Sequence, residues 1–260
     1  MTYTDIIVEK KERTAWITLN KPQVKNAMGK QTLLDILAAL EDIGNEPTIA
    51  VTVIKGAGGT FCSGMDLRER SGPNAPDAYE FNQLADRVFL GIEKFNKITI
   101  AMVNGYCMAG GFEIAMGCDF IIVDEDCKIG DGHMKLPGFV PNGGASVRLP
   151  RLIGPRKAKE LLYTGELVSG KEAEKMGIAN YAVPSSKLEQ TVEGLIARLT
   201  DKSPLGLSAM KMLVDGSRDC SLEAGLQFEH TAVKYLGKTE DQREAMAALK
   251  EKRKPNFTGK

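Results

Sequence analysis

One short segment combines glycines with an acidic residue at a spacing that suits chemistry on a carbonyl group. Ala109-Gly110-Gly111 follows an apolar run, and Glu113 stands three residues after Gly110 where a second apolar run begins. We expect a buried strand, a glycine turn and the first turn of a helix, whose N–H groups have no partner inside the helix. Such donors can hold negative charge that develops on a carbonyl oxygen, and Glu113 can move a proton at the neighbouring carbon.

A purely structural role for the same segment is an open alternative. Strand, glycine turn and helix follow one another in many α/β proteins. A glutamate in the first turn also stabilises a helix through the helix dipole alone. Features in the rest of the chain are needed to distinguish a catalytic role of this segment from a structural one.

A second strand with a glycine-rich loop precedes this segment. The range 49–54 is typical of a buried strand, and the loop 56–67 follows it, with Ser63 near its end. Two loops that each supply one backbone donor are the usual composition of an oxyanion hole. A phosphate loop or a plain tight connection is the alternative. Because no Lys-Ser/Thr pair follows at the spacing of a P-loop, a nucleoside triphosphate site is not expected.

The hydrophobic pattern predicts the elements that position these loops. We expect an antiparallel hairpin near the N-terminus, amphipathic helices between short apolar strands, and an all-helical tail. The segment 128–144 has little periodicity and resembles the wall of a site. The expected ranges are strands at 6–8, 15–19, 49–54, 98–103, 121–123 and 181–183, helices at 32–43 and 78–96, and a helical tail from 185 onward.

The amino-acid composition argues against several classes of binding partner. The 260 residues carry 34 Lys and Arg against 34 Asp and Glu, so no net charge points to nucleic acid or an anionic membrane. The five cysteines match no common metal spacing, so we expect buried thiols in a reducing compartment and no metal site. The N-terminus lacks the pattern of a signal peptide and no long apolar run occurs, so we expect a cytoplasmic protein without a membrane span.

Nearly the whole chain resembles the crotonase family, also called the enoyl-CoA hydratase/isomerase family. The motifs that carry the resemblance occur in the family's order. They are Lys21-Pro22 with Asn26-Ala27-Met28, then 60–67 (TFCSGMDL), 103–105 with 110–113 (VNG and GGFE), Cys118-Asp119, 148–154 (RLPRLIG) and 239–244 (TEDQRE).

The resemblance implies a fold and an assembly. The expected fold is α/β, a crotonase-like spiral of ββα units with a C-terminal helical trimerisation region. Residues 1–195 would form the acyl-CoA-binding core, and residues 196–260 would form helices that cover the site and assemble trimers or dimers of trimers. Coenzyme A would arrive as part of the substrate, so no separate cofactor is expected.

Site residues follow from the resemblance position by position. The N–H groups of Ser63 and Gly110 would hold the thioester oxygen, and Glu113 matches the first of two family glutamates. The remaining expected contacts are with the coenzyme: Cys62, Met65 and Asp66 border the adenine, and Lys25 and Lys252 bind its phosphates.

One departure from the family pattern affects the chemistry. Counting back from Arg148 without gaps, the second family glutamate is replaced by Met134, whose thioether cannot exchange a proton. We expect Met134 to pack against the acyl group. Nearby polar candidates for the missing proton-transfer role are Asp131, His133 and Asn142. Asp86 is a further candidate, at a position where dehalogenase-like relatives place a catalytic histidine. Asn142 falls where some isomerases and dehalogenases carry an aspartate and is a candidate substrate contact.

Two classes of enzyme function follow. The first is a lyase that adds water to an α,β-unsaturated acyl-CoA, open-chain or cyclic, through a thioester enolate, in fatty acid or aromatic acid metabolism. The alternative is another enolate reaction on the same fold: hydrolytic carbon–carbon cleavage of a β-keto acyl-CoA, decarboxylation or double-bond isomerisation. The retained Glu113 favours the first and the missing partner favours the second. A silent acyl-CoA-binding homologue is a third class, against which the intact Glu113 argues.

Overall fold

The computed structural model describes residues 2–73, 75–135 and 139–260, which form an α/β protein. The strands are β1 (Ile6–Lys11), β2 (Thr14–Leu19), β3 (Val51–Gly56), β4 (Ile98–Val103), β5 (Tyr106–Met108), β6 (Phe120–Asp124), β7 (Lys128–Gly130), β8 (Val168–Ser169) and β9 (Tyr181–Val183). The α-helices are α1 (Lys30–Gly44), α2 (Leu67–Ser71), α3 (Ala78–Glu93), α4 (Gly110–Gly117), α5 (Ala145–Ile153), α6 (Pro155–Thr164), α7 (Gly170–Met176), α8 (Leu188–Thr200), α9 (Pro204–Gly216), α10 (Leu222–Leu236) and α11 (Glu240–Glu251). Short 3-10 helices are η1 (Pro22–Val24), η2 (His133–Lys135), η3 (Ser185–Lys187) and η4 (Ser217–Asp219).

The main sheet has the strand order β1-β2-β3-β4-β6-β9. The predicted N-terminal hairpin is confirmed, because β1 and β2 pair antiparallel with Ile6 opposite Leu19. All other pairs in this sheet are parallel, so the loops that follow β3 and β4 leave it at the same edge. A second sheet of the short strands β5, β7 and β8 stands beside these loops.

Each face of the main sheet is covered by helices. On one face, α1 and α3 pack against the sheet through a large hydrophobic cluster. On the other face, Leu188, Val192 and Leu195 of α8 pack against β3, β4 and β6. The expected boundary between residues 195 and 196 falls inside α8, and Ile196 and Leu199 beyond it pack on the same cluster. Helix α8 as a whole therefore belongs to the core.

The sequence of α3 explains its position beside the site. Asp77 caps the helix by accepting from the N–H groups of Tyr79 and Glu80. Buried apolar residues then recur three or four positions apart, which places them on a single helix face. They are Phe81, Leu84, Ala85, Val88, Phe89 and Ile92.

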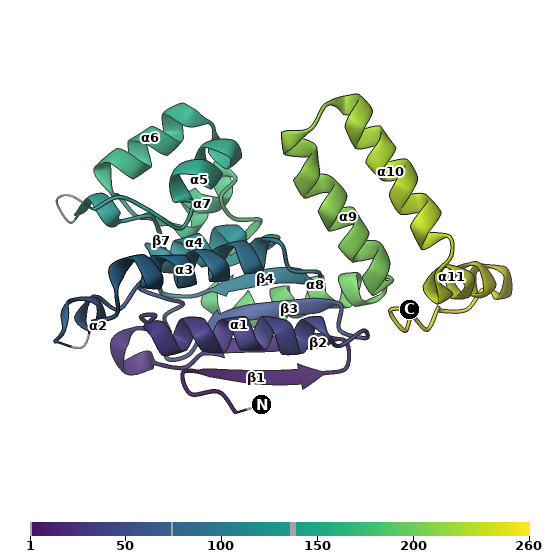
Figure 1. The fold of residues 1–260 in the computed structure, drawn as a ribbon, viewed down its shortest axis with the longest axis horizontal. Coiled ribbons are helices and arrows are strands. Elements are labelled where there is room, and N and C mark those ends of the chain that lie inside the picture. The colour runs from purple at the N-terminus through teal and green to yellow at the C-terminus, as the bar shows by residue number, and fades with distance from the viewer. Residues whose placement is uncertain (1, 74, 136–138) are drawn as a thin grey trace.

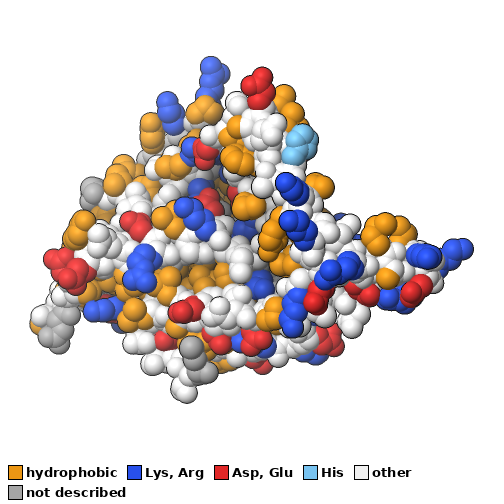
Figure 2. Space-filling model, turned by 45° about the vertical axis from the view of Figure 1, so that its right-hand side comes forward, with side chains coloured by type: hydrophobic (Ala, Val, Ile, Leu, Met, Phe, Trp, Pro, Cys, Tyr) orange, Lys and Arg blue, Asp and Glu red, His pale blue; other side chains and the backbone are white. Residues whose placement is uncertain are grey.

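The helical tail projects from the body, with α9 and α10 forming a hairpin and α11 lying beyond it (Figure 1). Lys211 anchors α9 to the sheet by an ion pair with Asp119 at 2.9 Å. Apolar side chains are exposed on all three helices, among them Leu222, Val233 and Leu249. On this part of the surface they are interspersed with basic and acidic side chains (Figure 2). In the described part of the chain, none of the helices has the length and apolarity needed to cross a bilayer.

Candidate active site

The first backbone donor of the site is Gly110 at the start of α4. Ala109, which precedes it, has φ 49° and ψ −123°, a conformation that non-glycine residues rarely adopt. The Ala109 N–H donates to the carbonyl of Asp131 at 2.8 Å, which helps to hold this strained turn. The turn leaves the Gly110 N–H at the positive end of the helix, without an acceptor among the described residues.

The second donor is Met65, which corrects the expectation of Ser63. The Ser63 N–H already donates to the carbonyl of Lys25 at 3.0 Å. Further along the loop, Met28 pairs with the residues on either side of Met65: its N–H donates to the Gly64 carbonyl and its carbonyl accepts from Asp66. Because backbone groups alternate in direction along an extended chain, the Met65 N–H faces away from Met28, and no described group accepts it.

The two donors lie side by side because the two turns approach closely. A Cβ built on Gly110 would lie 3.6 Å from the Met65 nitrogen. Gly64 has φ +106°, and a side chain there would lie 2.9 Å from the Cβ of Ala109. Glycine is therefore required at position 64 both for the backbone conformation and for the contact between the turns.

Glu113 is a buried carboxyl group in the first turn of α4. Its side chain accepts from the N–H of Gly143 at 2.6 Å and from that of Ala145 at 3.4 Å. Burial raises the pKa of Glu113 to about 7, while nearby His133 and the two amides oppose this shift. A carboxyl group with this pKa can accept and donate a proton near neutral pH.

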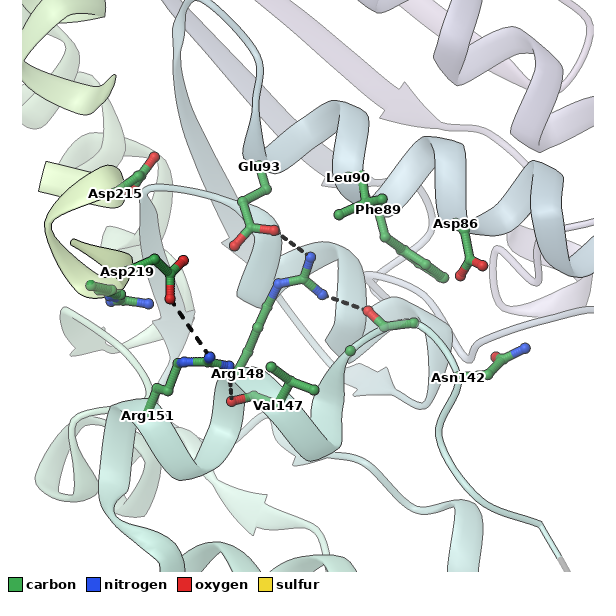
Figure 3. A pocket seen from close by; sticks show the side chains of 13 residues that line it. Asp86, Phe89, Leu90, Glu93, Asn142, Val147, Arg148, Arg151, Asp215 and Asp219 are labelled. Atoms are coloured by element: carbon green, nitrogen blue, oxygen red, sulfur yellow. Dashed lines mark hydrogen bonds and ion pairs between the residues drawn. The ribbon is translucent and has the colours of Figure 1, made fainter. Parts of the chain in front are cut away.

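A chain of polar contacts positions the loop that holds Glu113. The Arg148 guanidinium donates to the Gly143 carbonyl at 2.5 Å and to Glu93 of α3 at 2.6 Å (Figure 3). A Cβ on Gly143 would lie 2.5 Å from Glu113 Oε2 and would also clash with the ring of Phe89. Only glycine therefore fits between Glu113 and α3 at this position.

A histidine and an aspartate complete the surroundings of Glu113. His133 Nδ1 lies 2.9 Å from Asp131 Oδ1, and the His133 backbone N–H donates to Asp131 Oδ2 at 3.3 Å. Burial opposes the charged ring, but the hydrogen bond and charge of Asp131, together with Glu113, raise the pKa of His133 above its ordinary value. The site thus joins two free amides, a buried carboxyl group and an imidazole ring.

Comparison with known proteins shows the family of this chain. The family model for enoyl-CoA hydratase/isomerase matches residues 9–260. The chain belongs to the enoyl-CoA hydratase/isomerase family. A crotonyl-CoA hydratase of Syntrophomonas wolfei is 36% identical, with all of both chains covered. A 2,3-dehydroadipyl-CoA hydratase of Escherichia coli is 31% identical over 99% of this chain and 100% of the relative. A solved enoyl-CoA hydratase of Bacillus anthracis has a TM-score of 0.93 and 31% identity, covering 99% of this chain and 100% of that one.

The fold is therefore the crotonase fold. The structure also shows the surroundings of Glu113, which matches the first of the two family glutamates. Met134, the expected replacement for the second glutamate, is 42% exposed. The charged side chains that act on Glu113 are those of His133, one position earlier, which lowers its pKa, and of Asp131, which raises it. The replacement of the second family glutamate by Met134 therefore stays a prediction, and His133 is the alternative candidate for its role.

Asp86 and Asn142 lie together on the wall of a neighbouring pocket of about 490 Å³ between α3, α5 and the end of α9 (Figure 3). Burial raises the pKa of Asp86. Gly143 lines this pocket through its backbone, whereas the Glu113 side chain does not. No hydrogen bond or ion pair joins Asp86 to Glu113 among the described residues, so a proton-transfer role for Asp86 stays a prediction.

Two residues of the predicted adenine-binding loop have other partners in this crotonase fold. Cys62 is completely buried, and its thiol donates to the carbonyl of Asn26 at 3.1 Å. Cys62 is therefore a core residue rather than a surface contact, and burial raises the pKa of its thiol to about 12. Asp66 caps α2 by accepting from two backbone N–H groups, while the half-buried Met65 side chain lies beside Gly110.

The two lysines expected at the coenzyme phosphates lie at opposite ends of the sheet. Lys25 follows β2 at the edge where the glycine loops leave, and its ammonium stacks 5.1 Å from the ring of Tyr106. Lys252 ends α11, and the chain after it returns to Arg13, which precedes β2. Helix α11, which Lys252 follows, lies on the opposite side of the molecule from α2, which follows the first glycine loop (Figure 1), so Lys252 does not join the site within a single chain.

The functional roles of three groups were not predicted from the sequence. The Met65 and Gly143 amides are set by backbone contacts between distant segments, for which no side-chain pattern gives a signal. Asp131 is one of the polar candidates near Met134, but its contact with His133 was not predicted. Its position two residues before His133 was the available signal, because a short turn can bring the two side chains together.

Proposed function

We propose that this protein is an enoyl-CoA hydratase, which adds water to the C2–C3 double bond of an α,β-unsaturated acyl-CoA. The observation that carries the proposal is the convergence of two unpaired amides, Met65 and Gly110, beside the buried carboxyl of Glu113. Such a pair can hold the oxygen of a thioester. The carboxyl can then exchange protons with water at the adjoining carbons.

In the proposed reaction, ionised Glu113 takes a proton from water as the water oxygen bonds to C3. The π electrons of the double bond move toward the thioester, whose oxygen becomes an enolate held by the Met65 and Gly110 amides. A proton then adds to C2 and completes the 3-hydroxyacyl-CoA. An oxyanion-hole donor contributes about 10²–10³-fold to the rate of comparable reactions.

The relatives support hydration over the alternative enolate reactions. Both relatives described above are named as hydratases, one for crotonyl-CoA and one for 2,3-dehydroadipyl-CoA. The raised pKa of Glu113 also suits a group that accepts a proton from water near neutral pH. Hydrolytic carbon–carbon cleavage, decarboxylation and isomerisation lack a comparable observation.

The proposal is tested by incubating the purified protein with crotonyl-CoA. Hydration removes the absorbance of the enoyl thioester while a thiol reagent detects no free CoA; release of CoA would instead indicate hydrolysis. Glu113→Gln is expected to abolish turnover and to leave the affinity for CoA within a few-fold. The matched control Glu174→Gln, on the exposed surface of α7, should turn over like the wild type. A wild-type protein that leaves crotonyl-CoA and longer enoyl-CoA thioesters unchanged would refute the proposal.

We also propose that the C-terminal helices assemble the chain into trimers or pairs of trimers. A groove of about 900 Å³ runs between α9 and α10, and it is lined mainly by apolar residues such as Met212, Leu222 and Phe228. Covering exposed apolar side chains favours association. Sedimentation velocity at several concentrations measures the assembly, and a protein that remains monomeric throughout would contradict it.

We also propose that the protein is located in the cytoplasm and that it uses no separate cofactor. All five cysteines are free thiols in the structure, which suits a reducing compartment such as the cytoplasm. The proposed chemistry draws on backbone amides, on side chains of this protein and on coenzyme A carried by the substrate, so it needs no separate cofactor. Location is tested by fractionation of cells that produce the protein.

A further inference from the structure

Asp131 joins the two halves of the site. It is 1% exposed, and its carbonyl accepts the N–H of Ala109, the strained residue that presents Gly110. Its carboxylate has a different role: it contacts both the backbone N–H and the ring Nδ1 of His133. A buried aspartate thus fixes an imidazole ring relative to the start of α4.

The hydrogen bond to Asp131 determines which ring nitrogen is available. An ionised carboxylate can only accept, so Nδ1 of His133 carries the proton of this bond. No described residue makes a hydrogen bond to Nε2. The His133 side chain is 16% exposed, and its charge lowers the pKa of Glu113, which lies four residues after Ala109 on α4. His133 therefore presents one free nitrogen of an oriented ring beside the buried carboxyl group.

We propose that His133, oriented by Asp131, is the second proton-transfer group of the hydration reaction, in the role that a second carboxylate has in related hydratases. The inference rests on the proposed hydratase function and adds the source of the proton at C2. His133 acts as a catalytic residue, and Asp131 acts as a positioning residue.

The proton balance of the step is complete with these two groups. Glu113 takes one proton from water as the C3–O bond forms and the C2–C3 π bond breaks. The enolate electrons then form a C2–H bond with the proton of His133 Nε2, which leaves the ring neutral. Transfer of the proton from Glu113 to His133, directly or through water, restores the starting state. The reverse sequence dehydrates the product.

The charged groups that act on His133 come from three elements. Asp131 follows β7, Glu113 lies on α4 and Arg70 lies on α2. The two carboxylates raise the pKa of His133, and Arg70 lowers it. Turnover should therefore rise with pH as Glu113 ionises and fall at higher pH as the imidazolium loses its proton. Asp131→Asn removes one carboxylate, so it should move the alkaline limb of the profile to lower pH.

The experiment measures kcat and KM for crotonyl-CoA hydration across the pH range in four variants. His133→Gln is expected to lower kcat by about 10²–10⁴-fold, the range typical of a general acid–base group, and to leave KM within a few-fold. Asp131→Asn should lower kcat less and shift the alkaline limb. His133→Glu should recover part of the lost activity, with its alkaline limb at lower pH because a carboxyl group releases its proton earlier. The control His230→Gln changes the other histidine, exposed on α10, and should match the wild type.

The outcomes separate this inference from the proposed function. A wild type that hydrates crotonyl-CoA, with a His133→Gln variant of equal kcat, overturns the role of His133 and leaves the hydratase assignment standing. A uniform loss in Asp131→Asn without a shifted limb overturns the positioning role. No recovery in a folded His133→Glu variant, checked by circular dichroism, also counts against proton transfer at this position. An inactive wild type overturns both proposals.

Discussion

Replacing Glu113 by glutamine is expected to stabilise the folded protein at alkaline pH, in addition to abolishing turnover. Burial raises the pKa of Glu113 from 4.5 to about 7. Between these values the unfolded chain has released the proton that the folded protein still holds. Because the unfolded state binds fewer protons in this window, the free energy of unfolding falls as the pH rises through it.

The magnitude follows from the two pKa values. Each pH unit between them corresponds to about 1.4 kcal/mol, so ionising Glu113 costs the fold about 3 kcal/mol by the end of the window. Glutamine can still accept from Gly143 and Ala145, but its new NH₂ group loses hydrogen bonds to water at a cost of about 1 kcal/mol. We therefore expect a gain of about 2 kcal/mol at about pH 8 and a loss of about 1 kcal/mol at about pH 4.

Urea unfolding of both proteins at a fixed protein concentration and several pH values measures this difference. The sign should change between acidic and alkaline solution. Glu174→Gln is the control, because Glu174 is exposed on α7 and its replacement should give no pH-dependent difference. A Glu113→Gln variant whose difference from the wild type is the same at every pH would refute the idea that burial raises this pKa.

Four further predictions test the parts of the site. Gly143→Ala would place a Cβ 2.5 Å from Glu113, so we expect a loss of about 1–3 kcal/mol in urea unfolding and slower turnover. Gly110→Ala would crowd the space between the two free amides, so turnover with crotonyl-CoA should fall about 10²-fold while the melting temperature changes little. Glu93→Gln leaves the buried Arg148 without its carboxylate partner and should lower stability by about 1–3 kcal/mol, measured by the same unfolding. Dialysis against a chelator should leave turnover unchanged, and a loss restored by a metal ion would contradict the proposed chemistry.

The parts of the fold that the sequence predicts are those with regular hydrophobic repeats. Strands β2, β3 and β4 are apolar runs, and α1 and α3 carry apolar residues at helical spacing, so burial itself dictates these elements. The second sheet was not predicted, because β8 has two residues and β5 and β7 have three each. Glycine and polar residues interrupt the sequence around β5, β7 and β8, so these segments show no periodicity, and pairing with distant neighbours makes them strands.

The candidate site divides in the same way. Gly110 and Glu113 could be identified because a strand, a glycine turn and a helix follow one another directly, so local structure alone presents them. The second donor could not be identified, because the choice between Ser63 and Met65 depends on which N–H groups are already used by other segments. Lys25 takes the amide of Ser63, and pairing with Met28 turns that of Met65 toward the site.

The proposed second proton-transfer group, His133, shows why counting residues along a chain is unreliable in an irregular segment. No helix or strand there fixes which side chain occupies a given place. In a helix or strand, the number of residues between two positions determines the direction of their side chains. The segment after β7 is instead irregular and contains a single short 3-10 helix, η2. There, a shift of one residue changes the candidate for the second proton-transfer group from a thioether to an imidazole. The hydrogen bond between Asp131 and His133 favours the imidazole, because it orients the ring while Met134 is exposed. An acidic residue two positions before a histidine is thus a more useful signal in such a segment than its distance from Arg148.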